Sequence, residues 1–116
     1  MITEDYVSFE TAKLLKEKGF DVNCYTHYSS DGQNVYYNYQ TPSDGINMPT
    51  LQMAMKWLRQ VHKVHITTYP YGDYFCDNYQ FDIYKNNNFI LSKDEGYMTH
   101  EQACEAAIKY CLENLI

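Results

Sequence analysis

The sequence PTLQMAMKWLRQVHKVHITTY, residues 49–69, decides the fold because its hydrophobic period changes halfway along. Thr50 has the side chain of a helix N-cap. From Val64 the period becomes two: Val64, Ile66 and Thr68 alternate with the residues between them up to Tyr69, which predicts a strand that Pro70 ends. The stretch therefore predicts an amphipathic helix that packs on the sheet it feeds, with Trp57 and Leu58 in the middle of the core. At about 100° per residue, the apolar arc of this helix holds Leu51, Ala54, Met55, Trp57, Leu58 and Val61.

A first helix is expected from the N-cap Ser8 to about Lys18. Gly19 stands where a helix often ends in a left-handed residue. Phe20 follows at the position that contacts Leu15 in a Schellman motif. This boundary is the best specified in the chain.

A last helix is expected to begin at Thr99, with Gln102 completing a capping box. Its polar arc carries Glu105 and Lys109, which have the spacing of a favourable i,i+4 ion pair. Its apolar arc is slim and suits close packing on a sheet; it consists of Ala103, Cys104, Ala107, Ile108, Cys111 and Leu115.

The remaining segments read as strands and turns. Residues 22–28 and 35–40 predict a hairpin around the turn at 29–32, and residues 41–48 predict a loop. Beyond the central strand, residues 79–84 predict a strand and residues 89–91 a short edge strand. We therefore expect one α+β domain, residues 1–116, in the order α-β-β-α-β-β-(β)-α. It would have three helices on one face of a twisted, mostly antiparallel sheet of four or five strands.

Composition narrows the classes of function. The formal net charge of −6 and the absence of a Lys/Arg cluster oppose binding to long nucleic acids. No apolar run has transmembrane length and no N-terminal signal is visible, so we expect no membrane association and a cytoplasmic protein. The four cysteines, at positions 24, 76, 104 and 111, form no CxxC pair and are interpreted as reduced thiols.

Catalytic and metal motifs are weak. His62 and His65 form an HxxH, but one ends a helix and the other begins a strand. His100 and Cys104 have an i,i+4 spacing that can hold zinc, although core packing explains them better. Cys24 or Cys76 could pair with a histidine as a nucleophile, yet no local signal lowers a thiol pKa. The expectation is therefore no metal, no cofactor and no enzymatic activity.

Thirteen tyrosines are the unusual feature of the composition. Exposed tyrosine rings are typical of partner-binding surfaces. The alternative explanation for the many tyrosines is that their rings only cover a two-layer sheet. The first hypothesis is a protein-binding or adaptor domain that uses the acidic sheet side away from the helices. The alternatives are a small-molecule or nucleotide-binding pocket lined by the same rings, with weak activity at most, and a structural homo-oligomer. The candidate residues are Tyr25, Tyr36, Tyr69, Tyr71, Tyr74 and Tyr84.

Three helical phrases, VSFETAKLLKEKGF, PTLQMAMKWLRQVH and HEQACEAAIKYCLENLI, carry a resemblance to known sequences. They resemble a group of small uncharacterised proteins of gut Bacteroides-type bacteria and their phages. The resemblance implies a setting in a phage or another mobile element. It implies no activity.

Overall fold

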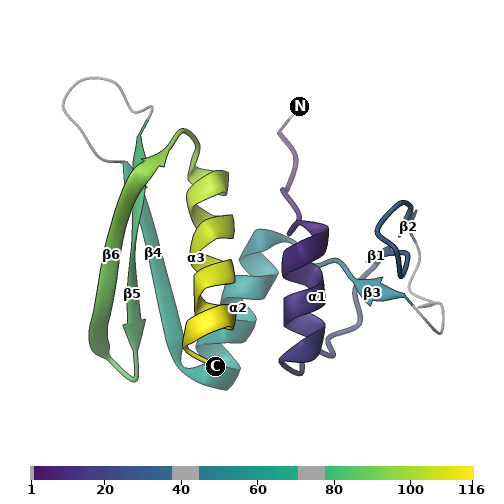
Figure 1. Ribbon diagram of the computed structural model, residues 1–116, viewed down its shortest axis with the longest axis horizontal. Coiled ribbons are helices and arrows are strands. Elements are labelled where there is room, and N and C mark those ends of the chain that lie inside the picture. The colour runs from purple at the N-terminus through teal and green to yellow at the C-terminus, as the bar shows by residue number, and fades with distance from the viewer. Residues whose placement is uncertain (1, 38–44, 71–77) are drawn as a thin grey trace.

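The computed structural model describes residues 2–37, 45–70 and 78–116. Within these residues the chain has an α+β fold with three helices and two three-stranded antiparallel sheets, as Figure 1 shows. One sheet has the order β2-β1-β3 and the other β4-β5-β6. The elements are α1 (Phe9–Glu17), β1 (Thr26–Tyr28), β2 (Val35–Tyr37), β3 (Ile46–Asn47), α2 (Leu51–His62), β4 (Val64–Pro70), β5 (Tyr79–Lys85), β6 (Asn88–Tyr97) and α3 (His100–Asn114).

The single sheet predicted from the sequence is wrong, because the helices lie between two separate sheets (Figure 1). β3, in a stretch predicted as loop, pairs with β1 through His27–Asn47 and Tyr28–Ile46. Only residues 48–50 then separate β3 from α2, so the small sheet stays beside the start of that helix. The hairpin of β1 and β2 is confirmed, although β1 begins only at Thr26 and residues 38–40 lie outside the described residues.

The change of period in the central stretch is confirmed. The hydroxyl of Thr50 caps α2 by accepting from the backbone N–H of Met53, and Lys63 ends the helix in a left-handed conformation with φ 59°. β4 begins at the next residue. Val61 is an exception to the predicted arc, because its side chain is exposed. The next residue, His62, ends the helix and packs on the Trp57 ring, with 4.7 Å between the ring centroids. The buried residues of α2 are Leu51, Ala54, Met55, Trp57 and Leu58.

The end of α1 is the predicted Schellman motif. The N–H of Phe20 donates to the carbonyl of Leu15 at 2.9 Å, and that of Gly19 donates to the carbonyl of Lys16 at 3.2 Å. Gly19 has a φ of +96°, which explains why glycine is needed there. The Phe20 ring then packs edge-on against Trp57 at 5.3 Å, so the end of α1 is tied to α2.

The hairpin of β5 and β6 turns through Asn86 and Asn87, whose φ angles of 51° and 67° suit a two-residue primed turn. β6 is longer than the predicted edge strand at 89–91, because its polar second half also pairs with β5. Backbone hydrogen bonds hold this half although most of its side chains are exposed. Two register shifts interrupt the pairing, one near each end of β5.

α2 and α3 cover one face of the large sheet, and α1 packs on α3 (Figure 1). The hydroxyl of Thr99 caps α3 as predicted, but the Gln102 side chain accepts from the N–H of Met98. Leu112, instead of the predicted Leu115, completes the fully buried face. No helix in the described part of the chain is long and apolar enough to cross a bilayer.

The predicted ion pair between Glu105 and Lys109 is not the contact these residues make. The Lys109 ammonium lies 2.8 Å from the carboxylate of Glu10 on α1. Glu105 accepts from the backbone N–H of Ser8 at 2.9 Å and from the hydroxyl of Thr11 at 2.8 Å. Both side chains therefore join α3 to α1, because α1 lies against the helix face that the sequence pattern assigned to solvent.

Candidate functional sites

The large sheet has one face that no described element covers. Phe81 and Ile83 of β5 are buried towards the helices, and alternate residues point the other way. The register carries this alternation from β5 to both neighbouring strands. We call the uncovered side the outer sheet face. It comprises His65, Thr67 and Tyr69 of β4, Gln80, Asp82 and Tyr84 of β5, and Phe89, Ile90, Ser92 and Asp94 of β6.

Aromatic and aliphatic side chains gather at one end of the outer sheet face. Tyr84 pairs with His65 on one side and with Phe89 on the other, and the rings of Tyr84 and Phe89 meet edge-on at 5.7 Å. A register shift beside Tyr84 turns both Phe89 and Ile90 outward. They are 58% and 38% exposed, which is unusual for large apolar side chains lying next to each other.

The middle of the outer sheet face is polar and well connected. The Tyr69 hydroxyl donates to the Asp82 carboxylate at 3.0 Å. Ser92 donates to the same carboxylate oxygen, and the amide of Gln80 donates to the Tyr69 hydroxyl. The hydroxyl of Tyr69 is therefore engaged within the sheet, and its side chain is held in place.

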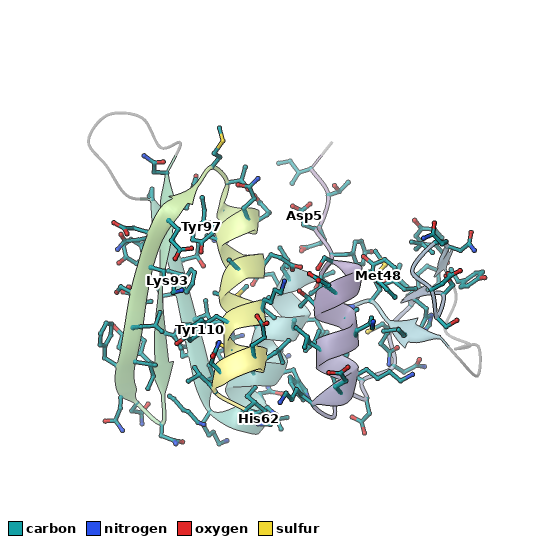
Figure 2. The ribbon with its side chains drawn as sticks, in the orientation of Figure 1. Asp5, Met48, His62, Lys93, Tyr97 and Tyr110 are labelled. Carbon is teal, nitrogen blue, oxygen red and sulfur yellow. The ribbon has the colours of Figure 1, made fainter. Side chains whose placement is uncertain are left out.

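The two lysines of the large sheet point towards α3. Lys85 donates to the carbonyl of Leu115 at 2.6 Å, at the C-terminal end of the helix. The Lys93 ammonium lies 5.0 Å from the centre of the Tyr110 ring, and Figure 2 shows the two side chains between β6 and α3. Within the described strands β4, β5 and β6, the outer sheet face therefore presents the carboxylates of Asp82 and Asp94 and no lysine or arginine.

The structure separates the six tyrosines predicted to bind a partner. Tyr69 and Tyr84 lie on the outer sheet face. Tyr36 lies on β2 of the small sheet and Tyr25 directly precedes β1, on the far side of the helices (Figure 1); they are 41% and 50% exposed. Tyr71 and Tyr74 lie outside the described residues. The sequence analysis missed Phe89 and Ile90, although the pair Asn86-Asn87 signals a tight turn that sets Phe89 opposite Tyr84.

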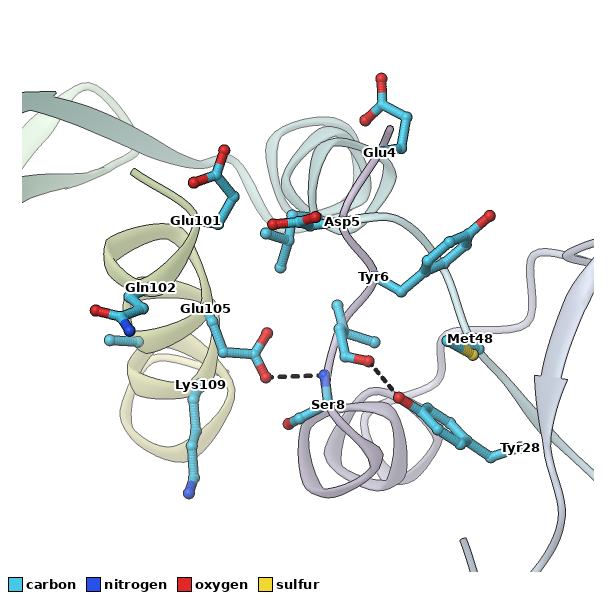
Figure 3. A pocket seen from close by; sticks show the side chains of 13 residues that line it. Glu4, Asp5, Tyr6, Ser8, Tyr28, Met48, Glu101, Gln102, Glu105 and Lys109 are labelled. Carbon is cyan, nitrogen blue, oxygen red and sulfur yellow. Dashed lines mark hydrogen bonds between the residues drawn. The ribbon is translucent and has the colours of Figure 1, made fainter. Parts of the chain in front are cut away.

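A pocket of about 570 Å³ lies between the N-terminal segment, α2 and α3 (Figure 3). Its apolar wall includes Val7, Met48, Leu51 and Ala106. Four carboxylates line it as well: Glu4, Asp5, Glu101 and Glu105. The tyrosines of its lining are Tyr6 and Tyr28, and neither belongs to the predicted set.

The charges around this pocket disfavour anions. Lys109 is the cation of its lining, and Glu10 already neutralises that ammonium. The Tyr28 hydroxyl donates to the carbonyl of Val7 at 2.7 Å, as Figure 3 shows. Burial, and then the charge of Glu105, raises the pKa of this hydroxyl. The pocket is thus negative, and its chemistry suits a cation with an apolar body better than a phosphate.

The thiols of Cys104 and Cys24 both have a raised pKa. The Cys104 sulfur lies 3.6 Å from Nδ1 of His100 and 3.4 Å from the Thr68 hydroxyl. Cys104 is buried, and burial raises the pKa of its thiol, so at neutral pH it stays protonated. Cys24 is similar, because burial raises the pKa of that thiol to about 11.

The histidine pair of the HxxH is divided, with His62 against Trp57 and His65 on the outer sheet face. Burial, helped by the nearby Lys85, lowers the pKa of His62. Residues 2–37, 45–70 and 78–116 contain no group of three His, Cys, Asp or Glu side chains placed to hold one metal ion. Comparison with protein-family models, with characterised proteins and with solved structures gave no match for the chain.

Proposed function

We propose that this protein is a non-enzymatic protein-binding or adaptor domain, and that the outer sheet face is its binding surface. The observation that carries the proposal is the uncovered end of the face, where the exposed side chains of Phe89 and Ile90 adjoin the half-buried ring of Tyr84. Aromatic side chains on a rigid scaffold supply large contact area at a small entropic cost. Exposed apolar groups of this kind on a sheet are typical of an interaction surface.

The rigidity of the face supports the same function. Tyr69, Asp82 and Ser92 bond to one another within the sheet, so little side-chain freedom is left to lose on binding. The buried, protonated thiol of Cys104 supports binding over catalysis, since it is not prepared to attack a substrate. The acidic net charge and the resemblance to proteins of gut bacteria and their phages support a cytoplasmic adaptor of a phage or mobile element.

The experiment is affinity capture with matched variants. Tyr84→Ala and Phe89→Ala change the outer sheet face, whereas Tyr25→Ala and Tyr36→Ala change exposed tyrosines at the small sheet. Circular dichroism would first establish that all four variants fold. We expect a specific partner to be lost with the first pair and retained with the second. Equal capture by all four variants would refute the proposal, and loss confined to the second pair would move the site to the hairpin.

A second candidate function rests on the pocket in Figure 3. Its volume of about 570 Å³ is that of a small-molecule site. Its carboxylates favour an organic cation over a nucleotide. An NMR titration with butylamine and with inorganic phosphate would test this, read at the amides of Met48 and Ala106. Shifts with the amine alone would support the candidate, and no shift with either would remove it.

Self-association is the third hypothesis: the outer sheet face of one copy would meet the same face of a second copy. Light scattering after size exclusion would detect a dimer, which would favour the structural function.

A further inference from the structure

We propose that the partner docks as an extended basic segment that adds to the free edge of β6 as a fourth strand. A Lys or Arg of that segment would lie beside Asp94. The inference rests on the proposed function and specifies the chemistry of the partner. It uses the backbone edge of β6 in addition to the side chains of the outer sheet face.

β6 is the more accessible of the two edges of the large sheet. It is ten residues long, against seven for β4, and it contains no proline. β4 ends at Pro70, which has no N–H to offer to another strand, and α2 runs directly into its other end. β6 lies on the side of the molecule farthest from α1 and the small sheet (Figure 1). An edge strand of this length presents unpaired N–H and C=O groups, which is the requirement for strand addition.

Charge complementarity identifies the occupant. Asp82 and Asp94 are on the outer sheet face, while Lys85 and Lys93 point to α3. Asp82 already accepts from two hydroxyls of the sheet, so Asp94 is the carboxylate better placed to attract a cation. Asp94 is exposed and lies on the edge strand itself. The chain as a whole carries a formal net charge of −6, which adds a long-range attraction for a basic segment.

The register of β6 predicts the sequence pattern of the segment. Ser92 pairs with Asp82 on the outer face, and Ile90 and Asp94, two residues before and after it, alternate to the same side, although each stands at a register shift and has no partner on β5. An added strand would set an apolar residue beside Ile90 and a basic residue beside Asp94. These two residues are four positions apart in either strand direction. Cross-strand pairs of this kind are the units that stabilise a sheet.

The test begins with a display library of random nine-residue peptides selected on the full chain. We expect enrichment of peptides with an apolar and a basic residue four positions apart. Binding of a selected peptide should weaken as salt is added, since exposed ion pairs are screened. On binding, the backbone amides of β6 should become protected from hydrogen exchange. No enrichment above background, or protection confined to the small sheet, would overturn the proposal.

Charge reversal then tests the contact with Asp94. Asp94→Lys should weaken the selected peptide about tenfold, and replacing the basic residue of the peptide by Glu should restore part of the affinity. Asp21→Lys is the matched control, because Asp21 is an exposed aspartate between α1 and β1. Equal affinities for Asp94→Lys and Asp21→Lys would overturn the proposal. If Tyr84→Ala still abolished capture of the partner, the proposed function would stand while this docking mode failed.

Discussion

The bond between Thr11 and Glu105 offers a quantitative test of how α1 is held against α3. In a capping box the residue at the third helical position reaches back to the N–H of the N-cap. In α1 that position is Thr11, whose side chain is not the glutamate or glutamine that accepts this N–H in a capping box. Glu105 of α3 supplies the carboxylate: one of its oxygens accepts both from the N–H of Ser8 and from the hydroxyl of Thr11. The capping box is therefore completed by another helix.

The magnitude follows from the number of bonds. A hydrogen bond to a charged group contributes about 1.5–3 kcal/mol, and leaving a buried partner unsatisfied costs about 1–3 kcal/mol. Glu105→Ala removes two such bonds and leaves the buried Thr11 hydroxyl without its acceptor on α3. The second oxygen of Glu105 is buried without a hydrogen-bond partner, so part of this gain is offset in the native protein. We therefore expect Glu105→Ala to lower the free energy of unfolding by about 2–3 kcal/mol.

A double-mutant cycle isolates the contact. Thr11→Val keeps the shape of the side chain and removes the hydroxyl, and it should cost about 1–2 kcal/mol. If the bond exists, the double variant Thr11→Val/Glu105→Ala should be more stable than the sum of the single changes implies, by about 1–2 kcal/mol. Urea unfolding followed by the fluorescence of Trp57, the one tryptophan, measures all four proteins. Additivity within about 0.5 kcal/mol would refute the reasoning. Glu113→Ala, an exposed change on the same helix, should stay within about 0.5 kcal/mol of the parent.

Three other predictions follow from single side chains. The pKa of His62 is lower in the folded protein than in the unfolded chain, so the contribution of His62 to stability is present above the unfolded pKa near 6.5 and is lost as the pH falls through the folded pKa. Since His62 packs on the Trp57 ring, Trp57 emission should change with a midpoint below pH 6.5. The variant His62→Gln should abolish that change. Both Gly19 and Gly32 have a positive φ, but a Cβ at Gly32 would lie 2.6 Å from an aromatic ring of α1, whereas a Cβ at Gly19 would meet open space. In urea unfolding, Gly32→Ala should therefore lower the free energy of unfolding more than Gly19→Ala does. Equal losses would contradict this. Burial raises the pKa of the Cys111 thiol to about 12. A variant that keeps Cys111 as its one cysteine should therefore resist Ellman's reagent at pH 8 until urea unfolds it. Rapid labelling of the native protein would contradict this prediction.

The helix ends could be predicted because their signals are local. Ser8, Thr50 and Thr99 each accept a backbone N–H within their own first turn, and Gly19 provides the one conformation that a Schellman motif requires. No distant residue is needed for these bonds, so the sequence pattern was sufficient. The change of period at Val64 succeeded for the same reason.

The division into two sheets could not be predicted, because it depends on contacts between distant residues. Ile46 and Asn47 have no strand pattern of their own, and they become a strand only by pairing with β1. The second half of β6 is similar: Ser92 and Lys93 lie beyond the predicted edge strand at 89–91, yet each has a partner on β5. Pairing partners of this kind are set by the tertiary fold and leave little trace in local composition.

The candidate surface was predicted in part. Alternation in β4 and β5 correctly separated Tyr69 and Tyr84 from the buried face, but it could not show that Tyr36 belongs to another sheet, with Tyr25 just before it. The pocket of Figure 3 left no signal, because its carboxylates come from segments about a hundred residues apart.

The charge of the outer sheet face and the attachment of α3 to the large sheet both follow from the alternation of side chains along β5 and β6. Lys85 binds a carbonyl at the C-terminal end of α3, where the helix dipole favours a cation. Lys93 packs over the ring of Tyr110 on the same helix. Both lysines share the inner side with Phe81 and Ile83 because side chains alternate along a strand. The same alternation therefore supplies α3 with its two cationic contacts and leaves Asp82 and Asp94 on the outer face without a lysine or arginine of these strands beside them.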